Sequence, residues 1–288
     1  MSASVRQNKR RKPDWLKTKL PSGKAYIGVK DIIAKHQLHT ICTSGHCPNI
    51  EDCWGRGTAT LMILGDICTR ACRFCNVKTG TPLAVDIDEP RRIAESVKLM
   101  KLKHVVLTSV DRDDLEDGGA AIWAETIRRI KIEMPEVTIE ALVGDFQGNY
   151  EDLKKVMDSK PDVLSHNLET VRRLSPDLRS KAKYDLSLKV IQHIAEYDGI
   201  VSKSGIMLGV GETYEEVLET MNDLREVHCD VFTIGQYMQP AGWNFEVKEY
   251  VHPDVFEKLR QAGLEKGFRH VESSPLVRSS YHAEKHIK

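Results

Sequence analysis

The sequence lacks the features that would direct it to a membrane, to nucleic acid or to secretion. No stretch approaches the ~20 consecutive apolar residues that span a bilayer. Lys and Arg together number 42, as do Asp and Glu, so the formal net charge is zero and provides no bulk attraction to polyanions. The start of the chain has no apolar segment typical of a secretory signal. These absences favour a cytoplasmic protein with neither a nucleic-acid nor a membrane partner.

An oxidising environment is also not indicated, although the chain contains seven cysteines. We therefore expect reduced thiols, metal ligands or both, rather than a disulfide framework. Internal repeats and low-complexity tracts are absent as well. The 288 residues are enough for one large domain or two smaller ones.

From about residue 58 the chain alternates strand-like with helix-like segments. Short, apolar, β-branched runs are typical of buried strands, and apolar residues three and four positions apart are typical of helices. Thr213 followed by Glu216 predicts a capping box at the start of a helix. The alternation predicts strands at 58–65, 103–109, 137–145, 162–167, 201–212 and 230–237, and helices at 89–102, 117–133, 149–159, 184–199 and 213–228.

Six strand-then-helix units in a row predict an α/β fold with a parallel sheet and right-handed crossovers. No Gly-rich dinucleotide turn follows the first strand, which favours a barrel over a Rossmann sheet. We expect a partial (β/α)6 TIM-type barrel over residues 58–250, an N-terminal extension over 1–57 and a C-terminal extension over 251–288. In such barrels the chemistry lies on the loops that follow the strands.

The loop after the first predicted strand reads CTRACRFC and contains Cys68, Cys72 and Cys75. This C-x3-C-x2-C spacing can place three thiolates around one compact centre, and soft thiolates favour zinc, copper(I) or iron–sulfur. Three ligands on a four-iron cube leave one iron open to a small molecule, and Phe74 would shield the cube from water. The alternatives are a zinc site with a distant fourth ligand, or unligated buried thiols.

A second triad, Cys42, Cys47 and Cys53, lies upstream in CTSGHCPNIEDC with C-x4-C-x5-C spacing. Gly45 and Pro48 indicate a loop rather than a helix face. By spacing alone, this triad is compatible with a zinc knuckle completed by one of three histidines, which are His46, His39 and His36.

The first loop resembles the CxxxCxxC loop of the radical S-adenosylmethionine (SAM) superfamily, with the usual aromatic residue before the third cysteine. Together with the second triad, the sequence resembles the lipoyl synthase family of that superfamily over essentially its whole length. The resemblance implies a barrel of the radical SAM type. It also implies two 4Fe–4S clusters, one that binds SAM and one auxiliary cluster held by the second triad.

The chain ends PLVRSSYHAEKHIK, which matches the RSSY motif of the same family. The resemblance implies that Ser280 is the fourth ligand of the auxiliary cluster and that Arg278 takes part in catalysis. An alkoxide is a harder partner for iron than a thiolate, so a labile ligand suits an iron that is released during turnover. By itself, RSSY would be read as an ordinary polar turn.

Further residues are assigned to SAM by the resemblance and by their places after the predicted strands. Thr108 and Ser109 stand where other radical SAM proteins often carry Gly-Gly-Glu, and their hydroxyls could accept hydrogen bonds from an ammonium group. Asn167 and Glu169 are expected at the ribose hydroxyls and Arg179 at the carboxylate. Gly209 is expected beside the adenine. The aspartates between 111 and 117 are interpreted as a solvated loop and a helix cap.

The resemblance implies a radical SAM sulfurtransferase that inserts two sulfur atoms at C6 and C8 of a protein-bound octanoyl-lysine, with the sacrificial auxiliary cluster as the sulfur source. It implies octanoylated lipoyl-carrier domains as partners, namely 2-oxoacid dehydrogenase acyltransferase subunits and the glycine cleavage H protein. An electron donor such as ferredoxin or flavodoxin and an iron–sulfur carrier are implied too. The alternatives are a radical SAM enzyme that inserts sulfur into biotin precursor or RNA, and a non-enzymatic zinc module.

Overall fold

The computed structural model describes residues 11–17, 24–36, 38–44, 47, 49–55, 58–281 and 283–285. Its main feature is one eight-stranded sheet with the order β1-β2-β5-β6-β7-β8-β9-β10. All neighbours pair in parallel except β1, which is antiparallel to β2. The strands are β1 (His39–Thr40), β2 (Thr58–Ile63), β5 (His104–Ser109), β6 (Thr138–Leu142), β7 (Val163–Ser165), β8 (Val201–Leu208), β9 (Val231–Gln236) and β10 (His270–Ser273).

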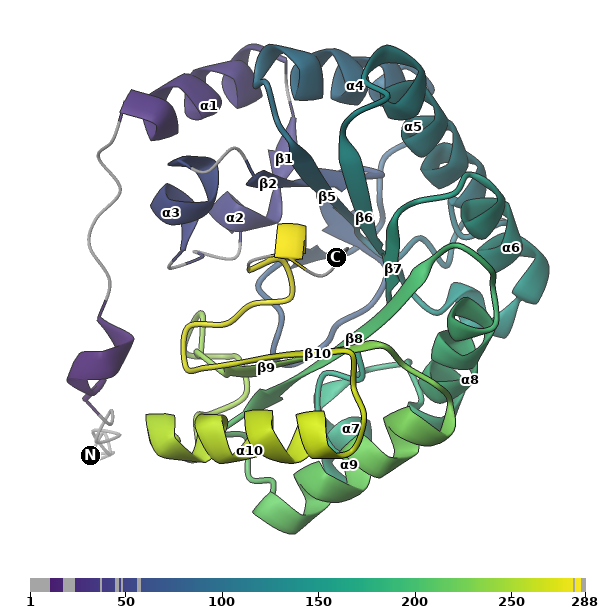
Figure 1. The fold of residues 1–288 in the computed structure, drawn as a ribbon. Coiled ribbons are helices and arrows are strands. Elements are labelled where there is room, and N and C mark those ends of the chain that lie inside the picture. Colours follow the sequence, from purple (N-terminus) through teal and green to yellow (C-terminus); the bar gives the residue numbers. More distant parts are fainter. Residues whose placement is uncertain are drawn as a thin grey trace, which may run out of the picture.

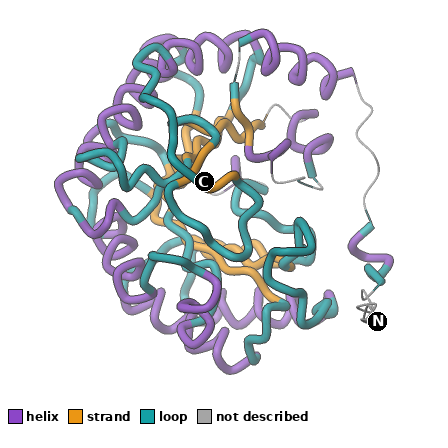
Figure 2. The backbone as a smooth tube through the Cα atoms, turned by 180° about the vertical axis from the view of Figure 1, so that it is seen from behind, coloured by secondary structure: helices purple, strands orange, loops and turns teal. Residues whose placement is uncertain are grey.

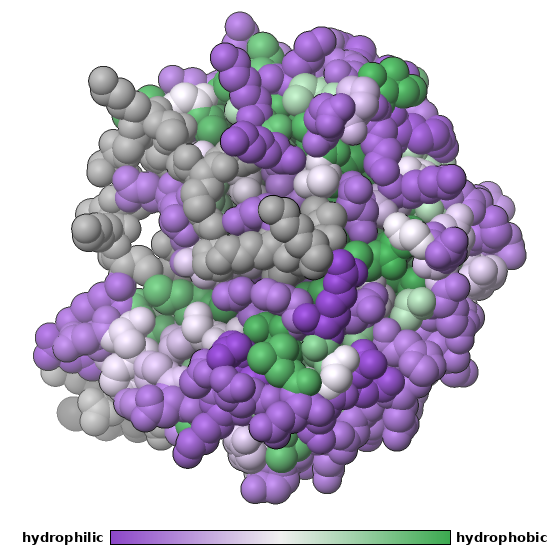
Figure 3. All heavy atoms as spheres, viewed as in Figure 1, coloured by the Kyte–Doolittle hydropathy of each residue, from purple (hydrophilic) through white to green (hydrophobic). Residues whose placement is uncertain are grey.

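Helices cover the outside of this curved sheet, as Figure 1 shows, and the two edges of the sheet are not paired with each other. The architecture is therefore the predicted partial barrel. The outer helices are α4 (Glu89–Leu99), α5 (Ala120–Glu133), α6 (Tyr150–Asp158), α8 (Tyr184–Ala195), α9 (Tyr214–Glu226) and α10 (Pro253–Glu265). Hydrophilic residues cover most of the face seen in Figure 3, as expected for helices with only one apolar side.

Local sequence accounts for most of these elements. Every residue of β2 and β9 is buried, which matches the continuous apolar runs of strands covered on both faces. The capping box predicted before α9 is present, because Thr213 accepts from the backbone of Glu216 and Glu216 accepts from the backbone of Thr213. None of the described helices is long and apolar enough to cross a membrane.

The parallel part of the sheet extends beyond the six predicted units. Residues 253–273, which we expected in an extension after the barrel, supply α10 and the seventh parallel strand β10. His270–Ser273 pair in register with Val231–Ile234 of β9. The sequence signal was weak because β10 has only four residues, and two of its residues are only partly buried.

Short helical elements lie before β2. They are η1 (Asp14–Leu16), α1 (Lys24–Lys35), α2 (Ile41–Ser44) and α3 (Ile50–Gly55). Figure 1 shows α2 and α3 beside β1 and β2, next to the yellow C-terminal segment at the centre of the ring of strands. Asn49 links the two ends of the chain by donating from Nδ2 to the carbonyl of Leu276 at 2.6 Å.

Candidate metal and cofactor site

A cavity of about 310 Å³ lies at the carboxyl ends of the parallel strands. Figure 2, from behind, shows the loops gathered over one end of the barrel. Strands β2, β5, β6, β8 and β9 and the loops after β2, β5, β6 and β7 contribute to its lining, and Val277, Arg278 and Ser279 reach it from the C-terminal segment. Apolar residues form much of the wall. They include Val110, Leu142, Val143, Ile206 and Met207.

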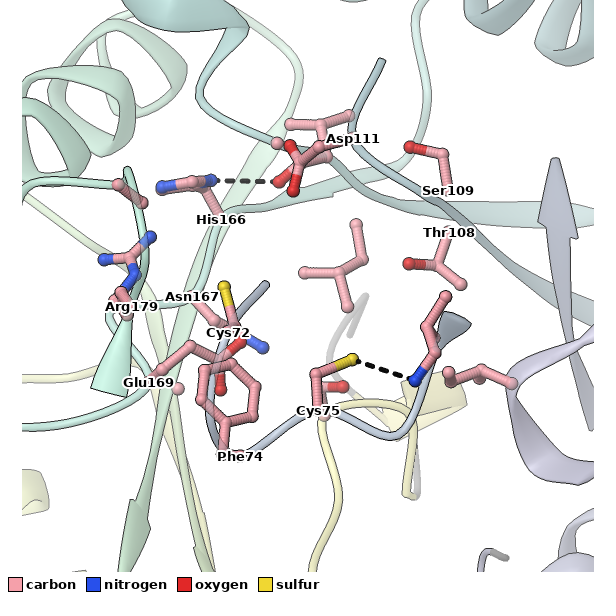
Figure 4. A pocket seen from close by; sticks show the side chains of 18 of the residues that line it. Cys72, Phe74, Cys75, Thr108, Ser109, Asp111, His166, Asn167, Glu169 and Arg179 are labelled. Atoms are coloured by element: carbon pink, nitrogen blue, oxygen red, sulfur yellow. Dashed lines mark hydrogen bonds between the residues drawn. The ribbon is translucent and has the colours of Figure 1, made fainter. Parts of the chain in front are cut away.

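All three cysteines of the first triad line this cavity, and Figure 4 shows Cys72 and Cys75 beside it. Backbone N–H groups of Arg70 and Asp111 point at Cys68 Sγ at 3.4 and 3.3 Å, and Val77 N–H points at Cys75 Sγ at 3.4 Å. Such bonds stabilise a thiolate. Burial nevertheless raises the pKa of each thiol, to about 12 for Cys75. Burial therefore favours the protonated thiols, and a metal that binds them must displace protons.

The loop that carries this triad is fixed by a buried ion-pair network around Arg70. The guanidinium donates to Asp113 from Nε at 3.0 Å and from Nη2 at 2.7 Å, and Nη2 donates to Asp145 at 2.7 Å. Asp111 adds a longer ion pair at 3.6 Å. Burial by itself would raise the pKa of Asp113 and of Asp145, but the hydrogen bonds from Arg70 leave both pKa values below normal.

This network corrects the interpretation of the acidic run. Asp111 and Asp113 are not solvated loop residues. Their carboxylates pair with Arg70, the Thr69 hydroxyl donates to the Asp111 carbonyl, and the same hydroxyl accepts from the N–H of Asp113. Asp117 does cap α5, as predicted, and accepts from the backbone of Gly119 and Ala121. Sequence reasoning did not single out Arg70. The available signal was a cation inside an apolar cysteine loop, which requires carboxylate partners when buried.

A hydrogen-bonded chain beside the cysteine loop orients Arg179. His166 Nδ1 lies 2.9 Å from the carbonyl of Val143, and Nε2 lies 2.9 Å from Ser187 Oγ. Arg179 Nη1 donates to the same Ser187 oxygen at 2.9 Å. Burial lowers the pKa of His166 to about 4, so the ring is neutral at pH 7 and accepts at Nε2 from the Ser187 hydroxyl. His166 and Ser187 were not anticipated from the sequence.

The residues predicted to bind SAM lie around the cavity with one exception. Thr108, Ser109, Asn167, Glu169 and Arg179 all line it, and Figure 4 shows them around one space. Asn167 Oδ1 is buried and has no hydrogen-bond partner, so a polar group is missing at that point. Burial raises the pKa of Glu169, although Arg179 and Asn167 partly offset the shift.

Gly209 is the exception, because it is not among the lining residues of the cavity. Its φ is +91°, and an added Cβ would lie 2.2 Å from Gln236 Nε2 and 2.3 Å from the Glu249 carbonyl. The structure therefore requires glycine here for the packing of two chain segments against β8, whatever binds nearby.

The second triad lies on the two short helices before β2. Cys42 is in α2 and Cys53 is in α3, so these two are on helices rather than on the expected loop. Cys47 lies between them and donates its N–H to the Cys42 carbonyl at 3.0 Å. Cys42 and Cys53 are buried, and burial raises the pKa of Cys47. Gly45, His46 and Pro48 lie outside the described residues.

The C-terminal motif approaches this triad. Arg278 is close enough to Cys47 for their charges to interact, and burial is the main cause that lowers the pKa of Arg278. Arg278 and Ser279 line the cavity, whereas Ser280 is partly buried and is not among the lining residues. Tyr281 donates its N–H to the Arg278 carbonyl at 2.8 Å and packs on the same apolar core as Cys47.

These donors fit iron–sulfur clusters and a polar cosubstrate. All seven cysteines are free thiols. The first triad supplies three soft ligands at one cavity, and the unpartnered Asn167 oxygen and the Arg179 guanidinium belong to the same cavity. Among the described residues, no three His, Cys, Asp or Glu side chains are gathered in the geometry of a single bound metal ion. The fit to a cluster rests on the type and placement of the ligands.

Comparisons with known proteins agree with this site. Residues 62–224 match the profile of the Radical SAM superfamily, and residues 2–47 match that of the N-terminal domain of lipoyl synthase of the Radical SAM family. The chain is 61% identical to lipoyl synthase of Treponema denticola, covering 96% of this chain and 95% of that protein. It is 59% identical to lipoyl synthase of Phocaeicola vulgatus, covering 96% and 98%. The crystal structure of methylornithine synthase (PylB) superposes with a TM-score of 0.57 at 15% identity, over 86% of this chain and 84% of that one, which shows a shared fold.

Proposed function

The chain belongs to the lipoyl synthase family of the radical SAM superfamily, and on this premise we propose a role for each triad. It is a radical SAM sulfurtransferase whose reaction inserts sulfur at C6 and C8 of an octanoyl chain attached to a lysine of a lipoyl-carrier protein. Its cofactors are SAM and 4Fe–4S clusters, and the auxiliary cluster is consumed as the sulfur source. When bound at this site, the reduced cluster and SAM supply a 5′-deoxyadenosyl radical that removes hydrogen from an unactivated carbon.

The first triad is proposed to hold the cluster that binds SAM. Cys68, Cys72 and Cys75 would be the ligands, and the network around Arg70 keeps their loop in one place. Cations and carboxylates on both sides of the loop leave it little freedom to change shape when the metal binds. Phe74 lines the cavity beside Cys75 and keeps water from the thiolates.

The polar side chains of the cavity are proposed to orient SAM. Thr108 and Ser109 would accept from its ammonium group, and Arg179, held by Ser187, would pair with its carboxylate. Asn167 and Glu169 would bond the ribose hydroxyls, which would give the buried Asn167 oxygen its missing partner. The apolar wall would receive the octanoyl chain and exclude other hydrogen donors from the reacting carbon.

The second triad is proposed to hold the auxiliary cluster, with Ser280 as its fourth protein ligand and Arg278 beside it. The observation that carries the proposal is the arrangement around one cavity. The first triad lines it directly, and Ile41, which precedes Cys42, lines it together with Arg278 and Ser279. An octanoyl chain that binds between these walls would lie within reach of both triads. The extensions 1–57 and 251–288 would then close the site around the barrel.

The partners follow from the reaction. The chain acts on lipoyl-carrier proteins. We propose that these are acyltransferase subunits of 2-oxoacid dehydrogenases and the glycine cleavage H protein. Ferredoxin or flavodoxin would deliver the electrons, and an iron–sulfur carrier would rebuild the spent cluster. The free thiols suit a reducing compartment such as the cytoplasm.

The test is anaerobic reconstitution followed by assay with an octanoyl-lysine peptide. We expect about eight irons per chain, and both thiolated intermediate and lipoyl product by mass spectrometry. Ser280→Ala should abolish product and retain SAM cleavage, whereas Ser279→Ala, the neighbouring control, should retain both. About four irons per chain, or SAM cleavage without any thiolated peptide in the unsubstituted protein, would contradict the proposal.

A further inference from the structure

A buried ion pair lies directly beneath the cavity and is not explained by the site described above. Lys203 on β8 and Glu140 on β6 both have no exposed side-chain surface. Glu140 lies two residues before the cavity-lining Leu142, and Lys203 lies two residues before the cavity-lining Gly205. Because side chains two apart in a strand share a face, both groups point into the barrel. They form a charged layer under the cavity floor.

The ammonium group of Lys203 has three N–H donors and three acceptors. It donates to Glu140 Oε1 at 2.7 Å, to Glu140 Oε2 at 2.8 Å and to the backbone carbonyl of Ser279 at 2.5 Å. Ser165 on β7 donates to Glu140 Oε1 at 3.1 Å and helps to fix the carboxylate. Three neighbouring strands therefore hold one cation, and that cation holds one carbonyl of the C-terminal segment.

The position of this carbonyl bears directly on Ser280. The carbonyl oxygen of Ser279 and the Cα atom of Ser280 belong to one planar peptide unit. Fixing the oxygen from the barrel interior therefore limits where the Ser280 side chain can point. Because all three N–H donors of Lys203 are used, its hydrogen bond to the Ser279 carbonyl fixes the orientation of this peptide unit. An apolar contact would not fix that orientation.

A second contact supports the same segment from β9. An added Cβ at Gly235 would lie 2.1 Å from the carbonyl oxygen of Val277, so the segment crosses this strand where a side chain would otherwise stand. One residue before Val277, the Leu276 carbonyl accepts a hydrogen bond from Asn49. The segment before Ser279 thus has contacts from β9 and from Asn49, which immediately precedes α3, while Ser279 itself is held by Lys203.

We propose that Lys203 is a positioning residue for the auxiliary site, and that the Lys203–Glu140 pair directs Ser280 toward the second triad by holding the Ser279 carbonyl. This inference rests on the proposed function, since it gives Ser280 its role as ligand. Lys203 does not contact the reacting atoms. A buried ion pair adds little net stability compared with apolar residues, and directional specificity is the role that the geometry assigns to it.

The experiment compares two variants that differ only in the amino group of Lys203. Glu140→Gln removes the carboxylate charge, and because burial already lowers the pKa of Lys203, we expect the lysine to become a neutral amine in this variant. That amine still donates to the Ser279 carbonyl and leaves no buried charge unpaired. Lys203→Met with Glu140→Gln also removes the donor, and it leaves no unpaired buried charge that would unfold the barrel. Lys154→Met, at an exposed ion pair with Asp158 on α6, controls for the loss of a lysine.

The first readout needs no cluster. Hydrogen–deuterium exchange of residues 278–281 in the metal-free full chain should be roughly tenfold faster in the double variant than in Glu140→Gln, with β5 to β9 unchanged. After reconstitution, the double variant should lose the spectroscopic signal of the auxiliary cluster and bind about four irons instead of about eight. It should still cleave SAM, so the ratio of 5′-deoxyadenosine to lipoyl product should rise.

Equal exchange rates and equal iron content in the two variants would overturn the inference. So would a double variant that loses SAM cleavage and lipoyl formation together. If the proposed function were wrong, the unsubstituted protein would not form lipoyl-lysine. The hydrogen–deuterium exchange of residues 278–281 in the metal-free protein would still show whether Lys203 holds this segment.

Discussion

The first triad lies on a loop that the barrel holds from several sides, whereas the second lies on short helices outside the parallel strands. Around the first, Arg70 pairs with Asp113 and Asp145, and backbone N–H groups point at two of the sulfurs. Around the second, α2 packs against β2, α3 packs against α1 and β2, and the C-terminal segment adds contacts through Arg278 and through the bond from Asn49 to Leu276. A loop held by a buried ion-pair network suits a centre that survives each turnover, whereas a site completed by a separate segment of the chain suits a centre that gives up sulfur.

The largest expected effect comes from substituting one cysteine in each triad, which distinguishes the roles of the two triads. Cys72→Ala should reduce SAM cleavage and lipoyl formation together, on the order of 10³-fold or more, which corresponds to over ~4 kcal/mol of lost transition-state stabilisation. Cys47→Ala should abolish lipoyl formation and retain SAM cleavage. Chromatography of 5′-deoxyadenosine, with iron content as a control for loading, measures both. If the two variants lost SAM cleavage equally, the triads would not have separate roles.

Substitution of Arg70 tests whether the ion-pair network holds the first loop in place. Arg70→Met leaves Asp113 and Asp145 without their cation, and removing one partner of a buried ion pair typically costs about 3–5 kcal/mol of folding free energy. The melting temperature should fall clearly, and the second triad should not be affected directly. Lys154→Met removes a pair in which both side chains are exposed, and should change stability by less than ~1 kcal/mol. Similar losses in the two variants would show that the network does not hold the loop.

The second triad can be perturbed from β9 by Gly235→Ala. The added methyl group would meet the Val277 carbonyl at 2.1 Å, so the C-terminal segment has to move, at a cost of about 1–3 kcal/mol. We expect loss of lipoyl formation with SAM cleavage largely retained. Gly242→Ala is the matched control, because a Cβ at that position meets nothing within 4 Å. Full lipoyl formation by Gly235→Ala would mean that this close approach is not needed.

The smallest effect concerns His104, which lies in the barrel at the start of β5. Burial lowers the pKa of His104 to about 3, and the charge of Lys203 adds to the shift. Below pH 6.5 this histidine is protonated in the unfolded chain but stays neutral in the folded chain. The free energy of unfolding therefore falls as the pH decreases towards about 3, by at most about 1.4 kcal/mol per pH unit.

His104→Gln removes this titration. The difference in unfolding free energy between pH 7 and pH 5.5, measured in urea, should therefore be smaller in the variant by about 1 kcal/mol. An unchanged difference would show that the ring is protonated in the folded protein. Because His104 lies in the barrel and in neither triad, this measurement reports on barrel stability separately from the two metal sites.

The sequence was sufficient where the information is local. The cysteine spacings, the capping box of α9 and the alternation of strands with helices each occupy a short stretch. The structure places the six predicted strands as expected, namely β2, β5, β6, β7, β8 and β9. Reasoning from the sequence failed where partners are distant. The carboxylates around Arg70 come from loops after two other strands, and the partners of Lys203 come from β6 and from the C-terminal segment. A charged residue in a strand signals only that partners exist, and the fold decides which ones.

The bond between Asn49 and Leu276 joins residues that are 227 positions apart in the chain. Contacts between such distant residues form late in folding, because the loop they close must first be shortened by the structure between them. For this chain that structure is the whole barrel. The thiols of the N-terminal helices are therefore synthesised long before their C-terminal neighbours, and the site of the second triad is complete only once the barrel has assembled.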